Sequence, residues 1–190
     1  MTQMMVPYPL QFYKVAPDVP DPSVATAASA CFDLHAYIKE GMEITIYNNK
    51  NVKKTFVVGK SHERTDLVNI GPGERALIPT GLIFNIPMGY SLRLYSRSGH
   101  ALKKGLSLAN GVGVVDCDYV EPVYAIVQNT SEAIQNVVDN ERVCQADLAF
   151  ALTFALQPTE EKPAQKTDRN GGFGSTGVTD VVTDSEGGEI

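Results

Sequence analysis

Residues 95–101, which read YSRSGHA, combine an arginine, two serines and a glycine directly after an apolar run. A guanidinium, hydroxyl groups and free backbone N–H groups brought to one place suit the oxygens of a phosphate. The same residues are also typical of an ordinary polar turn that leads into a short helix, which we expect over residues 101–106. On this segment alone, both interpretations stand.

Two carboxylates follow a second apolar run, in residues 108–119 (LANGVGVVDCDY). A polar turn at Asn110 and Gly111 leads into the run, which ends at Asp116 and Asp118. Residues two apart on a strand share one face, so we expect these carboxylates to lie together. A carboxylate among apolar neighbours can act as a general base or bind a cation. The alternative is a solvated strand end.

Two shorter segments place polar groups in apolar surroundings. Residues 30–36 (ACFDLHA) hold Asp33 among small and apolar side chains, where a carboxylate is either paired or functional. Residues 140–145 (NERVCQ) predict a turn followed by a strand that carries Arg142 and Gln145. The simpler alternative for residues 140–145 is a turn in which the buried side chain of Gln145 forms hydrogen bonds only with backbone groups.

Residues 169–177 (RNGGFGSTG) are rich in glycine yet hold Arg169 and Phe173 close together. A flexible linker does not require an arginine and an aromatic residue so close together. We therefore weigh a functional role for this segment equally with a flexible linker.

The chain has three cysteines and three histidines, which are scattered without metal-ligand spacing. A hard cation held by oxygen atoms is therefore the kind of metal we expect.

The chain has 190 residues, a net charge of -6 and 43% hydrophobic residues. This length favours one domain with a tail. The acidic balance argues against a nucleic-acid or anionic membrane partner, since both attract basic surfaces. The sequence has no run long enough for a membrane span and no signal-peptide pattern at its start, which predicts a cytoplasmic protein.

Glycine and proline separate many short apolar runs that are rich in branched and aromatic residues. Such spacing is typical of an all-β sandwich or barrel with many antiparallel strands. The predicted strands cover residues 42–47, 55–58, 75–79, 82–86, 91–95, 112–115, 123–128 and 147–156, with 131–138 favoured as a further strand.

The chain divides by composition into four parts. Residues 1–156 predict a folded core with an insertion near 47–71, and residues 59–73 read as a surface loop or hairpin insertion. Residues 157–168 have no large apolar side chain and predict a linker. The glycine-rich segment 169–177 and the acidic tail 178–190 follow.

Taken together and in order, five segments resemble the motifs of the dUTPase family, the homotrimeric deoxyuridine triphosphate diphosphatases. They are ACFDL (30–34), RSGHA (97–101), NGVGVVDCDY (110–119), NERVCQ (140–145) and RNGGFGSTG (169–177). The resemblance implies a jelly-roll-like β-barrel with one short helix and a flexible C-terminal arm. It also implies a homotrimer with shared active sites that uses Mg²⁺ to hydrolyse dUTP to dUMP and pyrophosphate.

The resemblance also assigns roles to residues by their place in the motifs. Asp116 would activate the attacking water, and Asp33 would anchor Mg²⁺ through its water shell. Phe173 would cap the uracil when residues 169–177 close as a lid. The residues assigned to substrate binding are Arg97, Ser98, Gly99, Asn110, Gly113, Val115, Tyr119, Gln145, Arg169, Phe173, Gly174, Ser175 and Thr176.

The sequence departs from the family pattern at several places. His100 replaces the usual leucine, and would either pack in its place, which we favour, or contact a phosphate. One residue is missing between Arg169 and the glycine pair, and residues 47–71 are extra, which makes them a candidate surface for a protein partner. The alternatives are a dCTP deaminase-type enzyme of the same barrel family and a nucleotide-binding regulatory protein.

Overall fold

The computed structural model describes residues 8–59 and 66–167, which form thirteen strands and one helix. The strands are β1 (Gln11–Lys14), β2 (Phe32–His35), β3 (Glu43–Tyr47), β4 (Lys53–Val57), β5 (Leu67–Ile70), β6 (Arg75–Pro79), β7 (Leu82–Asn85), β8 (Tyr90–Tyr95), β9 (Leu106–Leu108), β10 (Val112–Val115), β11 (Tyr124–Asn129), β12 (Gln135–Val138) and β13 (Arg142–Phe150). The helix is α1 (Ser98–Lys104). The prediction of an all-β fold with one short helix is confirmed.

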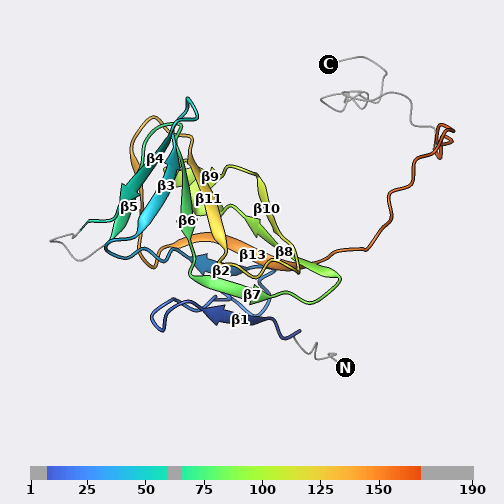
Figure 1. Cartoon of the computed structure of the whole chain (residues 1–190), viewed down its shortest axis with the longest axis horizontal. Coiled ribbons are helices and arrows are strands. Elements are labelled where there is room, and N and C mark those ends of the chain that lie inside the picture. The colour runs from blue at the N-terminus through green and yellow to red at the C-terminus, as the bar shows by residue number, and fades with distance from the viewer. Residues whose placement is uncertain (1–7, 60–65, 168–190) are drawn as a thin grey trace, which may run out of the picture. The chain divides into compact units, whose positions relative to one another are not determined.

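The strands form four antiparallel sheets (Figure 1). A five-stranded sheet has the order β4-β3-β6-β11-β9, and a four-stranded sheet has the order β10-β8-β13-β2. Two-stranded sheets pair β1 with β7 and β12 with β5. Strands that are distant in sequence are thereby brought side by side, such as β2 and β13 in the sheet that carries most of the candidate site.

The two larger sheets supply most of the hydrophobic core. Strands β3 and β11 alternate buried and exposed side chains, so that Ile44, Ile46 and Val127 point inward. From the other sheet, Leu92 and Leu94 join the same core. Burial of each such aliphatic side chain stabilises the fold by about 1.5–3 kcal/mol. The alternation is the feature that made these strands predictable from sequence.

The segment 47–71 is built into the fold. It contains β4 and β5, and its residues Val58, Val68 and Ile70 are each at most 2% exposed in the core. The prediction of a surface loop or hairpin insertion over 59–73 is therefore wrong for β5, whose polar neighbours hid a strand that pairs with the distant strand β12. Residues 60–65, which belong to the same predicted loop, lie outside the described residues.

Strand β13 runs from Arg142 to Phe150, so the strand predicted to carry Arg142 and Gln145 and the predicted strand 147–156 form one continuous strand, which ends six residues earlier than expected. Arg142, Gln145 and Asp147 interrupt the apolar pattern of this strand, so its two halves did not read as one run. The chain divides into two compact units, 1–153 and 154–190. The described part of the second unit, 154–167, is exposed and contains no helix or strand.

Helix α1 begins three residues before the predicted helix, so Ser98 and Gly99 belong to its first turn. It ends at Gly105, which has a left-handed φ of 64° and whose N–H donates to the carbonyl of His100. This backbone conformation favours glycine at a helix C-terminus. Among the described residues, no helix is long and apolar enough to cross a membrane.

Candidate functional site

One row of the four-stranded sheet brings together residues from four separate segments. The antiparallel register aligns Val112 with Tyr95, Tyr95 with Gln145, and Gln145 with Asp33. Directly paired residues place their side chains on the same face of a sheet. The sheet therefore gathers the first, second and fourth sequence motifs at one place, because Arg97 follows β8 within two residues of this row.

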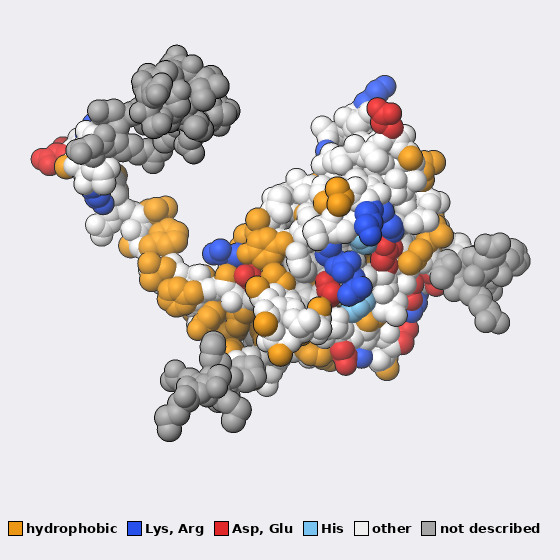
Figure 2. Space-filling model, turned by 180° about the vertical axis from the view of Figure 1, so that it is seen from behind, with side chains coloured by type: hydrophobic (Ala, Val, Ile, Leu, Met, Phe, Trp, Pro, Cys, Tyr) orange, Lys and Arg blue, Asp and Glu red, His pale blue; other side chains and the backbone are white. Residues whose placement is uncertain are grey.

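A polar pocket of about 350 Å³ lies at this place, and we call it the arginine pocket. It is lined by Ala25, Ser29, Ala30, Cys31, Asp33, Arg97, Ser98, Gly99, Arg142 and Gln145. Figure 2 shows basic, acidic and histidine side chains gathered on one area of the molecular face that it presents. All five residues that the sequence assigned from the first, second and fourth motifs are among the lining residues.

Asp33 holds two arginine side chains in the arginine pocket. Its Oδ1 accepts from Arg97 Nε at 2.8 Å, and its Oδ2 accepts from Arg142 Nη1 at 3.2 Å. Asp33 is 8% exposed, so it is a buried carboxylate with charged partners, as one of the two interpretations of its sequence segment predicted. With two guanidinium groups and one carboxylate, this cluster carries a formal charge of +1. It can attract an anion while the carboxylate fixes the orientation of both cations.

Other groups around the arginine pocket are neutral. Gln145 Nε2 donates to the carbonyl of Ser96 at 3.0 Å, which orients its amide. Burial lowers the pKa of His35 and raises the pKa of the Cys31 thiol. The imidazole and the thiol are therefore uncharged at neutral pH, and the arginines remain the cations of the pocket.

The second pocket, of about 440 Å³, lies beside the β10 hairpin, and we call it the hairpin pocket. It is lined by Leu77, Leu94, Asn110, Gly113, Val114, Val115, Asp116, Tyr119, Val123, Tyr124 and Ile126. Most of these side chains are apolar, with an amide, a carboxylate and two phenols as the polar groups. That composition suits an uncharged ring with a few hydrogen-bonding edges.

Glycine at position 113 keeps the hairpin pocket open. A Cβ built on Gly113 would lie 3.1 Å from Leu94 Cβ and 3.3 Å from Asn110 Nδ2. Both distances are tighter than ordinary van der Waals contact, so a side chain here would push against the pocket wall. Gly111 turns the hairpin with a φ of 68°, a conformation that glycine adopts without strain.

Asp116 and Asp118 do not share a strand face as predicted. Strand β10 ends at Val115, and a turn follows in which the N–H of Tyr119 donates to the Asp116 carbonyl at 3.2 Å. Because the strand ends before Asp116, the alternation of side chains along a strand does not place Asp116 and Asp118 on the same face. Both side chains are exposed, but only Asp116 belongs to the lining of the hairpin pocket.

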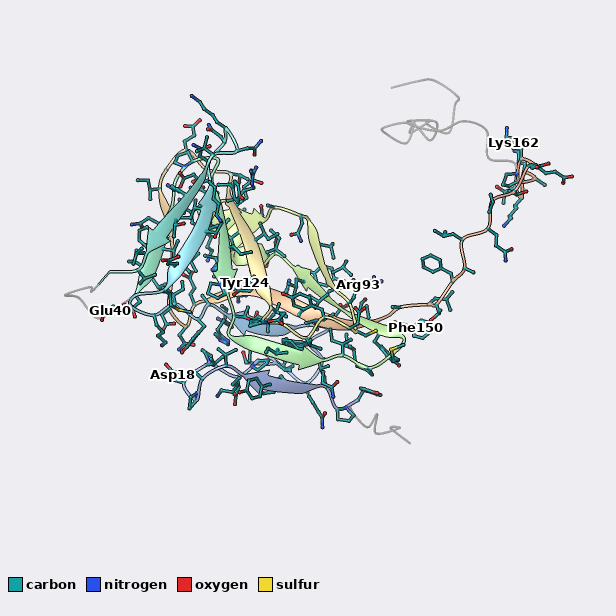
Figure 3. The ribbon with its side chains drawn as sticks, in the orientation of Figure 1. Asp18, Glu40, Arg93, Tyr124, Phe150 and Lys162 are labelled. Carbon is teal, nitrogen blue, oxygen red and sulfur yellow. The ribbon has the colours of Figure 1, made fainter. Side chains whose placement is uncertain are left out.

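Tyr119 is held in place by its own turn. Its hydroxyl donates to the carbonyl of Pro122 at 3.1 Å, and burial raises its pKa. Tyr124, on β11, lies in the same pocket and is labelled in Figure 3. The sequence motifs gave no sign of Tyr124, because strand β11 reads as an ordinary apolar run.

Arg142 belongs to the fourth motif, but the sequence assigned it no role in substrate binding.

His100 does not line the arginine pocket. It is 9% exposed, and its Nε2 lies 2.9 Å from Glu141 Oε1. The favoured prediction that His100 packs where the family has leucine agrees with this burial, although the imidazole also makes a polar contact. Arg169, Phe173, Gly174, Ser175 and Thr176 lie outside the described residues, so the predicted lid is not placed.

The two pockets have no lining residue in common within the described part of the chain. Asp116 comes four residues after Val112, just beyond the end of β10, and three strand spacings separate β10 from β2. With about 3.3 Å per residue and about 4.8 Å per strand, Asp116 and Asp33 lie roughly 20 Å apart in one chain. Nor do three or more His, Cys, Asp or Glu side chains group as a metal site among the described residues.

Comparison with known proteins gives consistent matches along the chain. The dUTPase family model matches residues 63–177. The deoxyuridine 5'-triphosphate nucleotidohydrolase of Caulobacter vibrioides is 33% identical over 162 residues, which cover 85% of this chain and 88% of the relative. The enzyme of the same name from Bdellovibrio bacteriovorus is 43% identical over 111 residues, covering 58% of this chain and 73% of the relative.

The fold is also similar to solved structures. A dUTPase of Staphylococcus bacteriophage 80alpha, solved with dUpNHpp, superposes with a TM-score of 0.69 at 20% identity, covering 90% of this chain and 99% of the other. The dUTPase from Streptococcus mutans gives a TM-score of 0.57 at 25% identity, with coverage of 76% and 98%. The jelly-roll-like architecture expected from the sequence motifs agrees with these likenesses.

Proposed function

Because the chain belongs to the dUTPase family, we propose that it hydrolyses dUTP to dUMP and pyrophosphate at a site built from the hairpin pocket and the arginine pocket. The observation that supports this proposal is the difference in polarity and charge between the residues that line the two pockets. One is apolar with a few polar groups and suits a nucleoside, and the other has two oriented guanidinium groups and suits phosphates.

The hairpin pocket would bind the deoxyuridine. Asn110 and the backbone around Gly113 and Val115 would read the uracil edge, and the narrow hairpin would reject the extra methyl of thymine. Cytosine presents the reverse donor and acceptor pattern, which would leave buried polar groups unpaired and is the stronger penalty. Tyr119, fixed by its hydrogen bond to Pro122, would lie under the deoxyribose and exclude a 2′-hydroxyl by shape.

Asp116 would act as the general base. Its carboxylate would accept a proton from a water molecule whose oxygen bonds to the α-phosphorus, while the bond from that phosphorus to the α,β-bridging oxygen breaks. Pyrophosphate leaves with the electron pair of that bond. Arg97, Ser98, Gly99 and Gln145 would hold the phosphates, and fixed cations would stabilise the negative charge that the leaving group gains.

Asp33 fits the role of an outer ligand for Mg²⁺. Its two oxygens already accept one guanidinium bond each, and a carboxylate has about four acceptor sites, so it can also accept from a metal-bound water. Mg²⁺ keeps several waters and is usually held by one or two carboxylates together with substrate phosphates. When bound, the ion would neutralise part of the charge of the triphosphate.

The separation of the pockets favours a homotrimer with shared sites. A distance of roughly 20 Å between Asp116 and Asp33, estimated from strand geometry, is too long for one nucleotide to use both within one chain. A neighbouring chain would supply the missing pocket, and the segment 169–177 would close over the site. In that lid, Phe173 would stack on the uracil, and Arg169, Ser175 and Thr176, with Gly174 allowing close approach, would contact the phosphates.

Turnover of dUTP by the purified full-length protein tests the function directly. We expect release of dUMP and pyrophosphate from dUTP and little from the four standard deoxynucleoside triphosphates. The variant Asp116→Asn should bind nucleotide but lose most turnover, while Glu121→Gln, an exposed carboxylate in the same turn, serves as the matched control. Near-normal turnover in Asp116→Asn would refute the assignment of the base, and ammonia release from dCTP would favour the deaminase alternative.

A protein partner through residues 47–71 remains a prediction, and the fold restricts where it can bind. Among its described residues, exposed side chains include those of the turn at 48–52, with Val52 at 58% exposure, and the outer side chains of β4, with Val57 at 57%. Since Val58, Val68 and Ile70 belong to the core, deletion of the whole segment would unfold the protein. Replacing only the turn tests partner binding while leaving the core intact.

A further inference from the structure

His100 forms a buried polar contact beside the arginine pocket. Its Nε2 lies 2.9 Å from Glu141 Oε1, and Lys104 Nζ, one helical turn later, lies 2.5 Å from the same oxygen. The other oxygen of Glu141 accepts the backbone N–H of Val138 at 3.0 Å. The carboxylate therefore joins the buried side of α1 to the turn between β12 and β13.

That turn carries one of the two arginines of the pocket. Glu141 immediately precedes Arg142, and the carbonyl of Glu141 accepts the N–H of Ala36 at 2.8 Å, just beyond the end of β2. The carbonyl of Arg142 lies 3.4 Å from Arg97 Nη1. Movement of Glu141 would therefore displace the backbone from which Arg142 extends and one of the contacts of Arg97.

The same two elements are also joined on the side that faces the pocket. There, Asp33 bridges Arg97, which precedes α1, and Arg142, at the start of β13. One link, through Asp33, belongs to the lining of the arginine pocket, and the other, through His100 and Glu141, is made by largely buried side chains outside that lining. With both links in place, α1 cannot rotate or slide against the turn without breaking a charge-assisted hydrogen bond.

We propose that His100 is a positioning residue that holds Arg97 and Arg142 in the geometry needed to bind the phosphates of the substrate. His100 is not one of the residues that line the pocket, and it is buried, so it acts through Glu141. A leucine, which the family pattern has at this place, can fill the volume but cannot donate to a carboxylate. The inference rests on the proposed function only for the identity of the phosphate ligand.

The test compares a variant that removes the donor with one that keeps it. His100→Leu removes the hydrogen bond to Glu141, whereas His100→Gln retains an N–H donor near the position of Nε2. Leu102→Ala, on the exposed side of the same helix, is the control for changes in α1 itself. Binding of pyrophosphate and of deoxyuridine to each full-length protein is measured by calorimetry, together with the KM for dUTP.

We expect His100→Leu to weaken pyrophosphate binding and raise the KM for dUTP, each by about fivefold, a typical coupling between residues of one network. Deoxyuridine binding should not change, since it involves only the hairpin pocket. His100→Gln and Leu102→Ala should behave as the wild type in all three measurements. If His100→Leu does not fold, His100→Asn, whose amide is too short to reach Glu141, replaces it.

The inference is overturned if the donor-free variant binds pyrophosphate as tightly as the wild type, even when its melting temperature falls, because the role would then be structural only. It is also overturned if the leucine and glutamine variants weaken pyrophosphate binding equally. Failure of the wild type to hydrolyse dUTP would instead refute the proposed function, and the pyrophosphate comparison would still decide the role of His100.

Discussion

Glu141 provides a quantitative prediction about stability and pH. Burial opposes its ionisation and would raise its pKa, but hydrogen bonds from His100 and Lys104, with a further one from the Val138 N–H, outweigh burial. The result is a pKa lowered from 4.5 to about 2. The perturbation that we consider is Glu141→Gln, which keeps the size of the side chain and removes its charge.

The sign of the effect follows from the lowered pKa. A carboxyl group that ionises more readily in the folded state stabilises that state above the unfolded pKa, and this contribution disappears as the pH falls through the folded pKa. A difference between 4.5 and about 2 corresponds to at most about 3 kcal/mol. Because the Lys104 side chain is 31% exposed and its charge is screened, we expect a smaller contribution of about 2 kcal/mol.

Urea denaturation of the wild type and of Glu141→Gln at several pH values measures this contribution. We expect the variant to be less stable than the wild type by about 2 kcal/mol at pH 7, and this difference in stability to narrow between about pH 4.5 and pH 2. Protein concentration must be the same throughout, because assembly contributes to the stability of an oligomer. Glu132→Gln removes an exposed carboxylate on a nearby turn and should show no such gap.

A gap that stays constant from pH 7 to pH 2 would refute the reasoning, since it would show that the charge of Glu141 has no part in the difference. Equal free energies of unfolding for the wild type and Glu141→Gln at pH 7 would also refute it. They would show that the free energy gained from the hydrogen bonds of the Glu141 carboxylate is cancelled by the cost of burying its charge.

Three further predictions concern the pockets and the C-terminal segment. Gly113→Ala should destabilise the fold by about 1 kcal/mol, as a clash with Leu94 outweighs the reduced entropy of the unfolded chain. Its KM for dUTP should rise, and unchanged kinetics and melting temperature would contradict the geometry of the hairpin pocket. Asp33→Asn should cost about 2–3 kcal/mol and weaken pyrophosphate binding, because Arg142 then loses its partner; calorimetry that finds unchanged affinity would contradict this. Truncation before Arg169 should leave a folded core by circular dichroism with severely reduced dUTP turnover, whereas loss of folding would contradict the division into units.

Several elements could be predicted because their pattern is local. Strands β6 and β10 match the predicted runs at both ends, since each is a short apolar stretch bounded by glycine, proline or a polar residue. Strand β5 was hidden by its polar neighbours, and β13 was predicted as two separate segments because Arg142, Gln145 and Asp147 interrupt its apolar pattern. The partner of Arg142 is Asp33, which lies 109 residues earlier in the chain, so no local pattern could show that pairing.

The amino-acid sequence by itself determined the fold class, the family and the residues of the motifs, because strand periodicity and the order of five motifs are properties of the chain. Only the tertiary structure decided how those residues are grouped. It joined Asp33 to Arg97 and Arg142, separated this cluster from Asp116, and placed His100 against Glu141. The physical reason is that strand register and packing bring together groups far apart in sequence, and no local pattern encodes which of them will meet.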